Sequence, residues 1–228
     1  MKTKFAIVIT LLSVTLWSCG PGKSGSAETT QPEEAKTPVR KEATISAKVL
    51  NPNLASRDQL TTVEGLTEAQ VDQIIAGRPH LDGAAFAKSL REMVGEEAYE
   101  TAASQLFLSM NLNTTDEDDF KLIPGVGNKM AHEFEEYRPY TSVEQFRREI
   151  GKYVDESQVL KYEQFVFVPV NLNTAPESQI LMIPGVGDKM AHEFEEYRPY
   201  GSMEQFRREI GKYVDENEVA RLERFVTL

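Results

Sequence analysis

The sequence predicts an all-α protein in which one group of four short helices occurs three times in tandem. Three observations lead to this prediction. A stretch of about 60 residues recurs along the chain, and residues 123–140 are repeated at 183–200 with one position changed. Residues that begin and end helices are dense within each repeat. No segment alternates polar and apolar residues in the way a half-buried strand does.

The first 18 residues have the pattern of an export signal. Lys2 and Lys4 precede an uncharged, mostly apolar run at 5–17, and small residues follow it. A positive end, a short apolar core and a small-residue break are typical of a secretory signal peptide, and the run is too short to span a bilayer comfortably. We therefore assign residues 1–18 to a signal peptide.

The segment Leu16-Trp17-Ser18-Cys19 resembles the bacterial lipobox, in which the cysteine is acylated and becomes the first residue of the mature protein. The resemblance implies an exported protein that is held in the bacterial cell envelope by a lipid anchor on Cys19. Gly20 follows where an inner-membrane lipoprotein is expected to have aspartate, which favours the outer membrane. The alternative is a plain signal peptide followed by an incidental cysteine.

Four further segments complete the predicted organisation. Residues 19–48 are rich in Gly, Pro, Ser, Thr, Glu and Lys and lack aromatic side chains, so they are expected to form a disordered tether. The repeats then occupy residues 49–110 (copy 1), 111–170 (copy 2) and 171–228 (copy 3). The joins between them are short and partly apolar. Neighbouring copies should therefore touch, which helps because a domain of about 60 residues buries only a marginal core.

Capping pairs mark where the helices of each copy begin. They are Thr114 with Glu117, Ser142 with Gln145 and Asp155 with Gln158 in copy 2, and Thr174 with Glu177, Ser202 with Gln205 and Asp215 with Glu218 in copy 3. In copy 3 the first helix is predicted at about 175–182 and the second at about 188–198. The second must end there because Pro199 disfavours helical geometry in the residue before it.

The bend between these two helices is the candidate binding site. It consists only of Ile183–Gly187, so Gly185 and Gly187 must supply backbone angles that side chains would forbid, while Val186 can enter the core. The first turn of the next helix then presents free N–H groups with no side chain to shield them. Such a helix start binds phosphate oxygens, and Lys189 adds a positive charge nearby.

Ile123–Ala131 and Ile183–Ala191 resemble the helix-hairpin-helix motif, hydrophobic-Pro-Gly-hydrophobic-Gly-x-Lys-x-Ala. The preceding Asn-Leu-Asn-Thr and the following Arg-Pro-Tyr are similar to the soluble domain of the ComEA competence family. The resemblance implies three tandem double helix-hairpin-helix domains, which are small SAM-like helical bundles. It also implies binding to double-stranded DNA without sequence preference, in a role such as DNA uptake.

The residues expected to contact DNA fall into two groups. The first group lies at the bends: Gly125, Val126, Gly127 and Lys129 in copy 2, and Gly185, Val186, Gly187 and Lys189 in copy 3. The second group lies near a later bend in each copy, at Ile150–Val154 and Ile210–Val214: Arg147, Arg148, Lys152, Arg207, Arg208 and Lys212. The resemblance further implies that a sodium or potassium ion could sit on the carbonyl groups of Gly125, Gly127, Gly185 and Gly187. No other cofactor or metal is predicted.

Copy 1 departs from the motif at its first bend, Val63–Thr67. It lacks the proline and the second glycine, and it has Glu64 in the bend and Ala69 in place of the lysine. A glutamate that faces a phosphate is repulsive. Copy 1 is therefore expected to have a structural or protein-binding role.

The overall charge limits how strongly the chain can bind DNA. The formal net charge is -11, and copies 2 and 3 contain 12 and 11 acidic side chains against seven basic ones each. Binding should be weak and sensitive to salt, with a log–log slope of about -4 to -5 if four to six phosphates are neutralised. One alternative is a protein–protein scaffold of the cell envelope, because the fold also resembles a protein-binding extrinsic subunit of photosystem II. A second alternative is that the glycines are needed only to form the turn and that the bend binds no ligand.

No catalytic arrangement stands out, so we predict that the protein is not an enzyme. His132-Glu133 and His192-Glu193 resemble the start of a zinc-protease helix but lack its second histidine. The acidic run at 116–119 lacks the glycine and terminal glutamate of a calcium loop.

Overall fold

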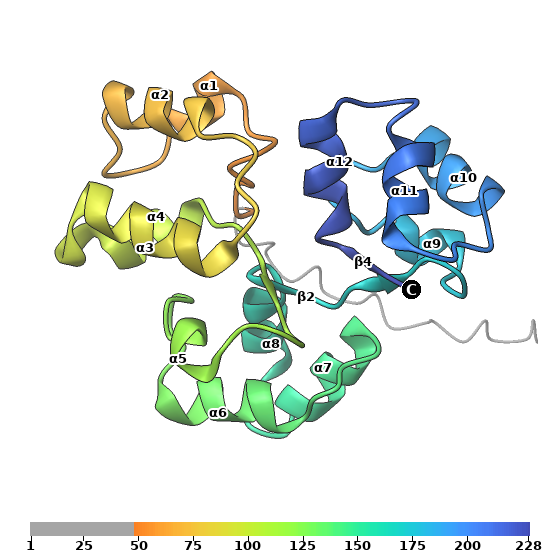
Figure 1. Cartoon of the computed structure of the whole chain (residues 1–228). Coiled ribbons are helices and arrows are strands. Elements are labelled where there is room, and N and C mark those ends of the chain that lie inside the picture. Colours follow the sequence, from red (N-terminus) through yellow and green to blue (C-terminus); the bar gives the residue numbers. More distant parts are fainter. Residues whose placement is uncertain (1–47) are drawn as a thin grey trace, which may run out of the picture. The chain divides into compact units, whose positions relative to one another are not determined.

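The computed structural model describes residues 48–228, so the predicted signal peptide, Cys19 and all but the last residue of the predicted tether lie outside the described residues. The described part is mostly helical, with twelve helices and four strands of two residues each (Figure 1). The predicted all-α class is confirmed.

Each copy contains four helices. Copy 1 has α1 (Arg57–Leu60), α2 (Glu68–Ala76), α3 (Gly83–Val94) and α4 (Glu96–Gln105). Copy 2 has α5 (Glu117–Phe120), α6 (Asn128–Glu136), α7 (Val143–Ile150) and α8 (Glu156–Glu163). Copy 3 has α9 (Glu177–Ile180), α10 (Asp188–Glu196), α11 (Met203–Ile210) and α12 (Glu216–Glu223). No helix within 48–228 has the length and apolar character needed to cross a membrane.

Most of the predicted caps are present. The side chains of Ser142, Asp155, Ser202 and Asp215 each accept a hydrogen bond from the backbone N–H three residues later. The Thr114 and Thr174 predictions are wrong, because α5 and α9 begin two residues later, after Asp116 and Pro176. Both threonine N–H groups bond back to an asparagine carbonyl and belong to a turn before the helix.

Short parallel strands close copies 2 and 3, and no pattern in the sequence predicts them. β1 (Met110–Asn111) pairs with β2 (Val166–Phe167), and β3 (Val170–Asn171) pairs with β4 (Val226–Thr227). In copy 1 the same place has a single bridge between Leu50 and Leu106. Strands of two residues are too short for any alternation to be visible. The first residues of a copy thus lie beside its last residues.

A polar clamp joins the start of each copy to the end of its second helix. In copy 2 the side-chain amide of Asn113 donates to the carbonyl of Tyr140 at 2.8 Å and accepts from the Tyr140 N–H at 2.7 Å. The Arg138 guanidinium donates to the carbonyl of Leu112 at 2.5 Å and to that of Thr115. The Asn-Leu-Asn-Thr and Arg-Pro-Tyr segments are therefore structural here. Asn53 with Arg78, and Asn173 with Arg198, form the same clamp in the other copies.

Copies 1 and 2 are in contact, as their short join predicts. Their buried side chains belong to one continuous core, whereas those of copy 3 form a separate core. The Tyr99 hydroxyl of α4 donates to the carbonyl of Leu122 at 2.6 Å, and Lys88 pairs with Asp119 at 2.7 Å. These contacts fix the segment that leads into the bend of copy 2.

We expect Asn113→Ala to lower the free energy of unfolding by about 1–3 kcal/mol, because two buried backbone groups lose their partner. Urea unfolding followed by circular dichroism measures the change. Thr114→Ala, at the exposed neighbouring position, is the matched control and should alter stability by less than about 0.5 kcal/mol. Equal losses in the two variants would contradict a specific clamp.

Candidate nucleic-acid interface

The bend of copy 2 spans Ile123–Gly127 and joins α5 to α6. Gly125 has a φ of 76°, a left-handed conformation that favours glycine. The Val126 side chain is buried and its N–H donates to the carbonyl of Ile123 at 3.0 Å. Val186 is buried in the same way, which agrees with the core position predicted for it. The amides of both valines are already used within the turn, so they are not open to a DNA phosphate.

The first turn of α6 is open to an anion. Gly127 is the N-cap and no side chain caps this helix. A β-carbon added at Gly125 or Gly127 would meet nothing within 4 Å, so the approach to the bend is clear. Lys129 lies exposed in the same turn, and no carboxylate of residues 48–228 lies within ion-pair distance of it. Unsatisfied N–H groups, the helix dipole and a free ammonium group together favour an anion here.

The corresponding bend of copy 1 is closed by its own side chains. Thr67 caps α2 by accepting from the N–H of Gln70, and the Gln70 side chain accepts from the N–H of Thr67 at 2.8 Å. The Glu64 N–H donates to the Gln105 side chain at 3.2 Å, whereas copy 2 has proline at the equivalent position and so has no N–H there. The amides of Thr67 and Gln70, whose counterparts in copy 2 have no side-chain cap, are thus satisfied internally in copy 1. This arrangement agrees with the expectation that copy 1 does not bind phosphate.

The bend of copy 3 has the same backbone but different surroundings. Gly185 has a φ of 84°, and Gly187 is an N-cap without a side-chain cap on α10. However, a β-carbon on Gly185 would lie 2.9 Å from Arg221 Nη2 and 3.3 Å from the side chain of Leu54. Arg221 is buried, pairs with Glu218 at 2.6 Å, and donates from Nη1 to the carbonyl of Pro184 at 2.6 Å. One side of this bend is therefore covered.

The cations predicted at the later bends are held in ion pairs. The pairs in copy 2 are Arg147 with Glu163 at 2.6 Å, Arg148 with Glu149 at 2.9 Å and Lys152 with Glu149; those in copy 3 are Arg207 with Glu223 at 2.5 Å, Arg208 with Glu209 at 2.8 Å and Lys212 with Glu209. Exposed ion pairs are weak, so a phosphate can compete for these cations. Their net contribution to the local potential is nevertheless smaller than that of Lys129 and Lys189.

The later bends also lack an open helix start. Asp155 caps α8 by accepting from the N–H of Gln158 at 2.9 Å, and hydrogen bonds from Gln158 and Ser157 lower the pKa of that carboxyl group. Asp215 caps α12 in the same way. A carboxylate at these helix starts excludes a phosphate from them.

A tyrosine pair connects the two bends of copy 2, and the sequence reasoning missed it. The hydroxyl groups of Tyr137 and Tyr153 are 2.8 Å apart. Lys129 Nζ lies 5.5 Å from the centre of the Tyr153 ring, and Lys152 Nζ lies 4.8 Å from that of Tyr137. Hydrogen bonds to Tyr137 and Glu133 raise the pKa of Tyr153. The only sequence signal was that both tyrosines recur 60 residues later.

Copy 3 repeats this pair incompletely. Tyr197 and Tyr213 are again 2.8 Å apart, and Lys212 Nζ lies 4.7 Å from the Tyr197 ring centre. Within the described residues, no aromatic ring lies beneath Lys189. The hairpin lysine is therefore positioned by a ring in copy 2 but not in copy 3.

Three of the four carbonyl groups suggested for a monovalent ion already accept a hydrogen bond. The Gly125 carbonyl accepts from the Tyr162 hydroxyl at 3.1 Å, and those of Gly127 and Gly187 accept the first helical N–H of Ala131 and Ala191. In copy 3 the Arg221 guanidinium approaches the bend and would repel a cation. Among residues 48–228, no group of three or more His, Cys, Asp or Glu side chains could hold a metal ion.

Comparison with known families identifies one region. A family model described as the helix-hairpin-helix motif matches residues 166–227, which is copy 3 with the end of copy 2. The chain thus contains a helix-hairpin-helix motif, which indicates nucleic-acid binding in general. No curated protein and no solved structure matches the chain.

Tyr153→Leu should weaken duplex DNA binding about two- to fivefold, because it removes the ring beneath Lys129 and an exposed cation–π contact contributes roughly 0.5–1 kcal/mol. Tyr153→Phe keeps the ring and should bind like the parent chain. Fluorescence anisotropy with a labelled duplex at low salt measures the affinity. Tyr213→Leu is the matched control in copy 3, and a loss as large as that of Tyr153→Leu would contradict a positioning role.

Proposed function

We propose that the protein binds double-stranded DNA without sequence preference, through the bends that precede α6 and α10. The observation that supports this most is the difference between helix starts. α6 and α10 begin at glycines without any side-chain cap, whereas α2 is closed by Thr67 and Gln70. A helix start whose N–H groups have no side-chain partner, and which carries an exposed lysine, can donate hydrogen bonds to a phosphate.

The proposed contact is to the DNA backbone and not to the bases. Amides of the first turn would hold phosphate oxygens, and Lys129 and Lys189 would add charge, so no group in the site reads a base edge. Few cations of residues 48–228 lie beyond ion-pair distance of a carboxylate, so each bend is expected to bind weakly. Two bends on one duplex would gain through effective concentration.

Charge reversal at both bends tests the proposal. We expect Lys129→Glu combined with Lys189→Glu to weaken binding of the full chain, purified in detergent, to a mixed-sequence duplex by at least about tenfold, because each lost charge-assisted contact contributes roughly 1.5–3 kcal/mol. Anisotropy titrations at several salt concentrations give the affinity and its salt slope. Arg57→Glu reverses one exposed charge in copy 1 and should change the affinity less than about twofold.

Gly127→Ser separates the amides from the charge in the same titration. The added side chain has open space and would cap α6 itself, which stabilises the helix by a few tenths of a kcal/mol while it competes with phosphate. Weaker binding with unchanged net charge is the expected result. Unchanged binding by both this variant and the double charge reversal would refute the site.

The rival function is a protein–protein scaffold of the cell envelope. The paired cations of the later bends and the net charge of -11 favour it, because both reduce the attraction for a polyanion. It predicts no retardation of duplex DNA at tens of micromolar protein in low salt. Titration of the full chain with duplex DNA at low salt therefore decides between the two functions.

The proposed setting is the bacterial cell envelope. Cys19 would be acylated, residues 19–48 would act as the tether, and the folded copies would capture or retain DNA outside the cytoplasm, as in DNA uptake. Gly20 in place of aspartate favours the outer membrane. These assignments rest on the sequence and on the resemblance to the ComEA family.

Metabolic labelling with a fatty acid tests the anchor. The parent chain, expressed with its signal in a bacterial host, should incorporate label and partition with membranes, because several acyl chains on one residue give stable anchoring. Cys19→Ala should remove both properties. Continued incorporation of label by Cys19→Ala would show that the anchor lies elsewhere or is absent.

A further inference from the structure

We infer that the bends of copies 2 and 3 are not equivalent binding sites, although the five residues of the bend are identical in the two copies. Leu54 of copy 1 covers the bend of copy 3, so the bend of copy 2 is the first to engage DNA. The inference rests on the proposed function, and it assigns copy 1 a regulatory part in it.

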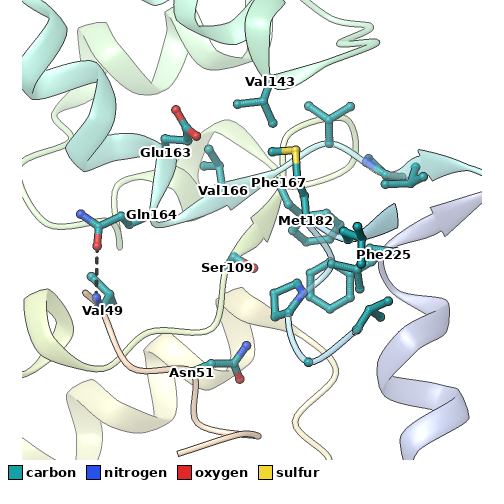
Figure 2. A pocket seen from close by; sticks show the side chains of 18 of the residues that line it. Val49, Asn51, Ser109, Val143, Glu163, Gln164, Val166, Phe167, Met182 and Phe225 are labelled. Carbon is teal, nitrogen blue, oxygen red and sulfur yellow. Dashed lines mark hydrogen bonds between the residues drawn. The ribbon is translucent and has the colours of Figure 1, made fainter. Parts of the chain in front are cut away.

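The contacts at the two bends carry this inference. The side chain of Leu54 lies 3.3 Å from the place that a β-carbon on Gly185 would occupy, whereas nothing lies within 4 Å of the same place on Gly125. Leu54 lines a cleft together with Met182 and Gly185, and Figure 2 labels Met182 and Phe225 among the residues that line it. A phosphate that approaches Gly185 from this side would meet an apolar side chain.

The leucine is peculiar to copy 1. The equivalent positions in the other copies are Thr114 and Thr174, and all three residues lie in the same turn before the first helix. The turn itself therefore does not require leucine. Leu54 also remains 44% exposed, so it is not a core residue of copy 1. Its close contact is with the bend of copy 3.

The contact between Leu54 and the bend of copy 3 can open, because copy 3 is packed less closely on its neighbours than copy 1 is on copy 2. Copy 1 packs closely on copy 2 because Gly83 lies against the join, where a β-carbon would be 2.6 Å from the Leu108 carbonyl. Val143 takes the place of Gly83 in copy 2, and beside it the cleft of about 770 Å³ separates copy 2 from the bend of copy 3 (Figure 2). Met182 is 53% exposed, whereas its counterpart Leu122 is 6% exposed.

Few contacts hold copy 3 in this position. The Phe167 and Phe225 rings are 4.6 Å apart, and the Arg224 guanidinium donates to the Ser109 carbonyl at 2.9 Å. Both contacts lie at the join and not at the bend. A duplex bound at copy 2 could thus displace Leu54 without unfolding copy 3. Copy 3 would then add its own contact to the same duplex.

Leu54→Thr tests whether Leu54 covers the bend of copy 3. Threonine occupies the equivalent position of the same turn in copies 2 and 3, so the substitution should not disturb the turn. In duplex titrations of the full chain, we expect Leu54→Thr to tighten binding about three- to tenfold, because the second bend becomes available to a duplex already bound at the first. Adding Lys189→Glu should cancel this gain. In the parent chain, Lys189→Glu should weaken binding much less than Lys129→Glu.

Leu81→Thr is the matched control. Leu81 is a leucine of copy 1 that is 46% exposed, copy 2 has Thr141 at the equivalent position, and the cleft does not include it. The Leu81→Thr variant should bind the duplex with the affinity of the parent chain. An equal increase in affinity from Leu54→Thr and Leu81→Thr, or no increase from either, would overturn the inference.

Hydrogen exchange without DNA keeps the test independent of the proposed function. Leu54→Thr should speed exchange of the amides in residues 181–188 and leave those in 121–128 unchanged. Unchanged exchange in 181–188 would overturn the cover even if DNA binds. Faster exchange there, with no duplex binding by any variant, would refute the proposed function and leave the cover in place.

Discussion

Backbone amides at the start of each second helix need partners, and the way they obtain them distinguishes the three copies. A helix leaves its first N–H groups without intrahelical acceptors, so they bond to a side chain, to water or to a ligand. Copy 1 uses Thr67 and Gln70 for this purpose, whereas copies 2 and 3 have glycine N-caps that offer nothing. A difference at two or three side chains therefore decides whether the amides of this helix start are satisfied within the protein or remain open.

The fold itself does not depend on that choice. The clamp of asparagine and arginine is present in all three copies, including copy 1, where the bend is closed. It ties the loop before the first helix to the end of the second helix, and so it sets the angle at which the bend is presented. The fold and the proposed ligand site therefore depend on separate residues, and one can be lost while the other is kept.

Much of this architecture is predictable from the sequence, because it rests on local rules. Caps such as Ser142 and Asp155 are found from the spacing of two residues, and the bend is found from its glycines. The two-residue strands are too short for a pattern, and the ion pair of Arg147 with Glu163 joins residues 16 apart on different helices. Candidate cations were thus identified by type, but their partners depend on tertiary packing.

The different surroundings of the two bends could not be predicted from the sequence at all. Residues 123–140 and 183–200 are almost the same, so no local rule could separate them. The difference comes from Leu54, more than a hundred residues away in the chain, and from Arg221, which stands where copy 2 has Lys161. Repeated sequence indicates repeated structure, but the neighbours of each repeat are set by its position in the array.

The parallel pairing of β3 with β4 brings the entry and exit of a copy together. A segment whose two ends are adjacent can be duplicated or removed while its interior stays intact, because the flanking chain needs no new path. Gene duplication can therefore vary the number of copies between related proteins at little cost to folding. Each added copy is then free to diverge at its bend alone.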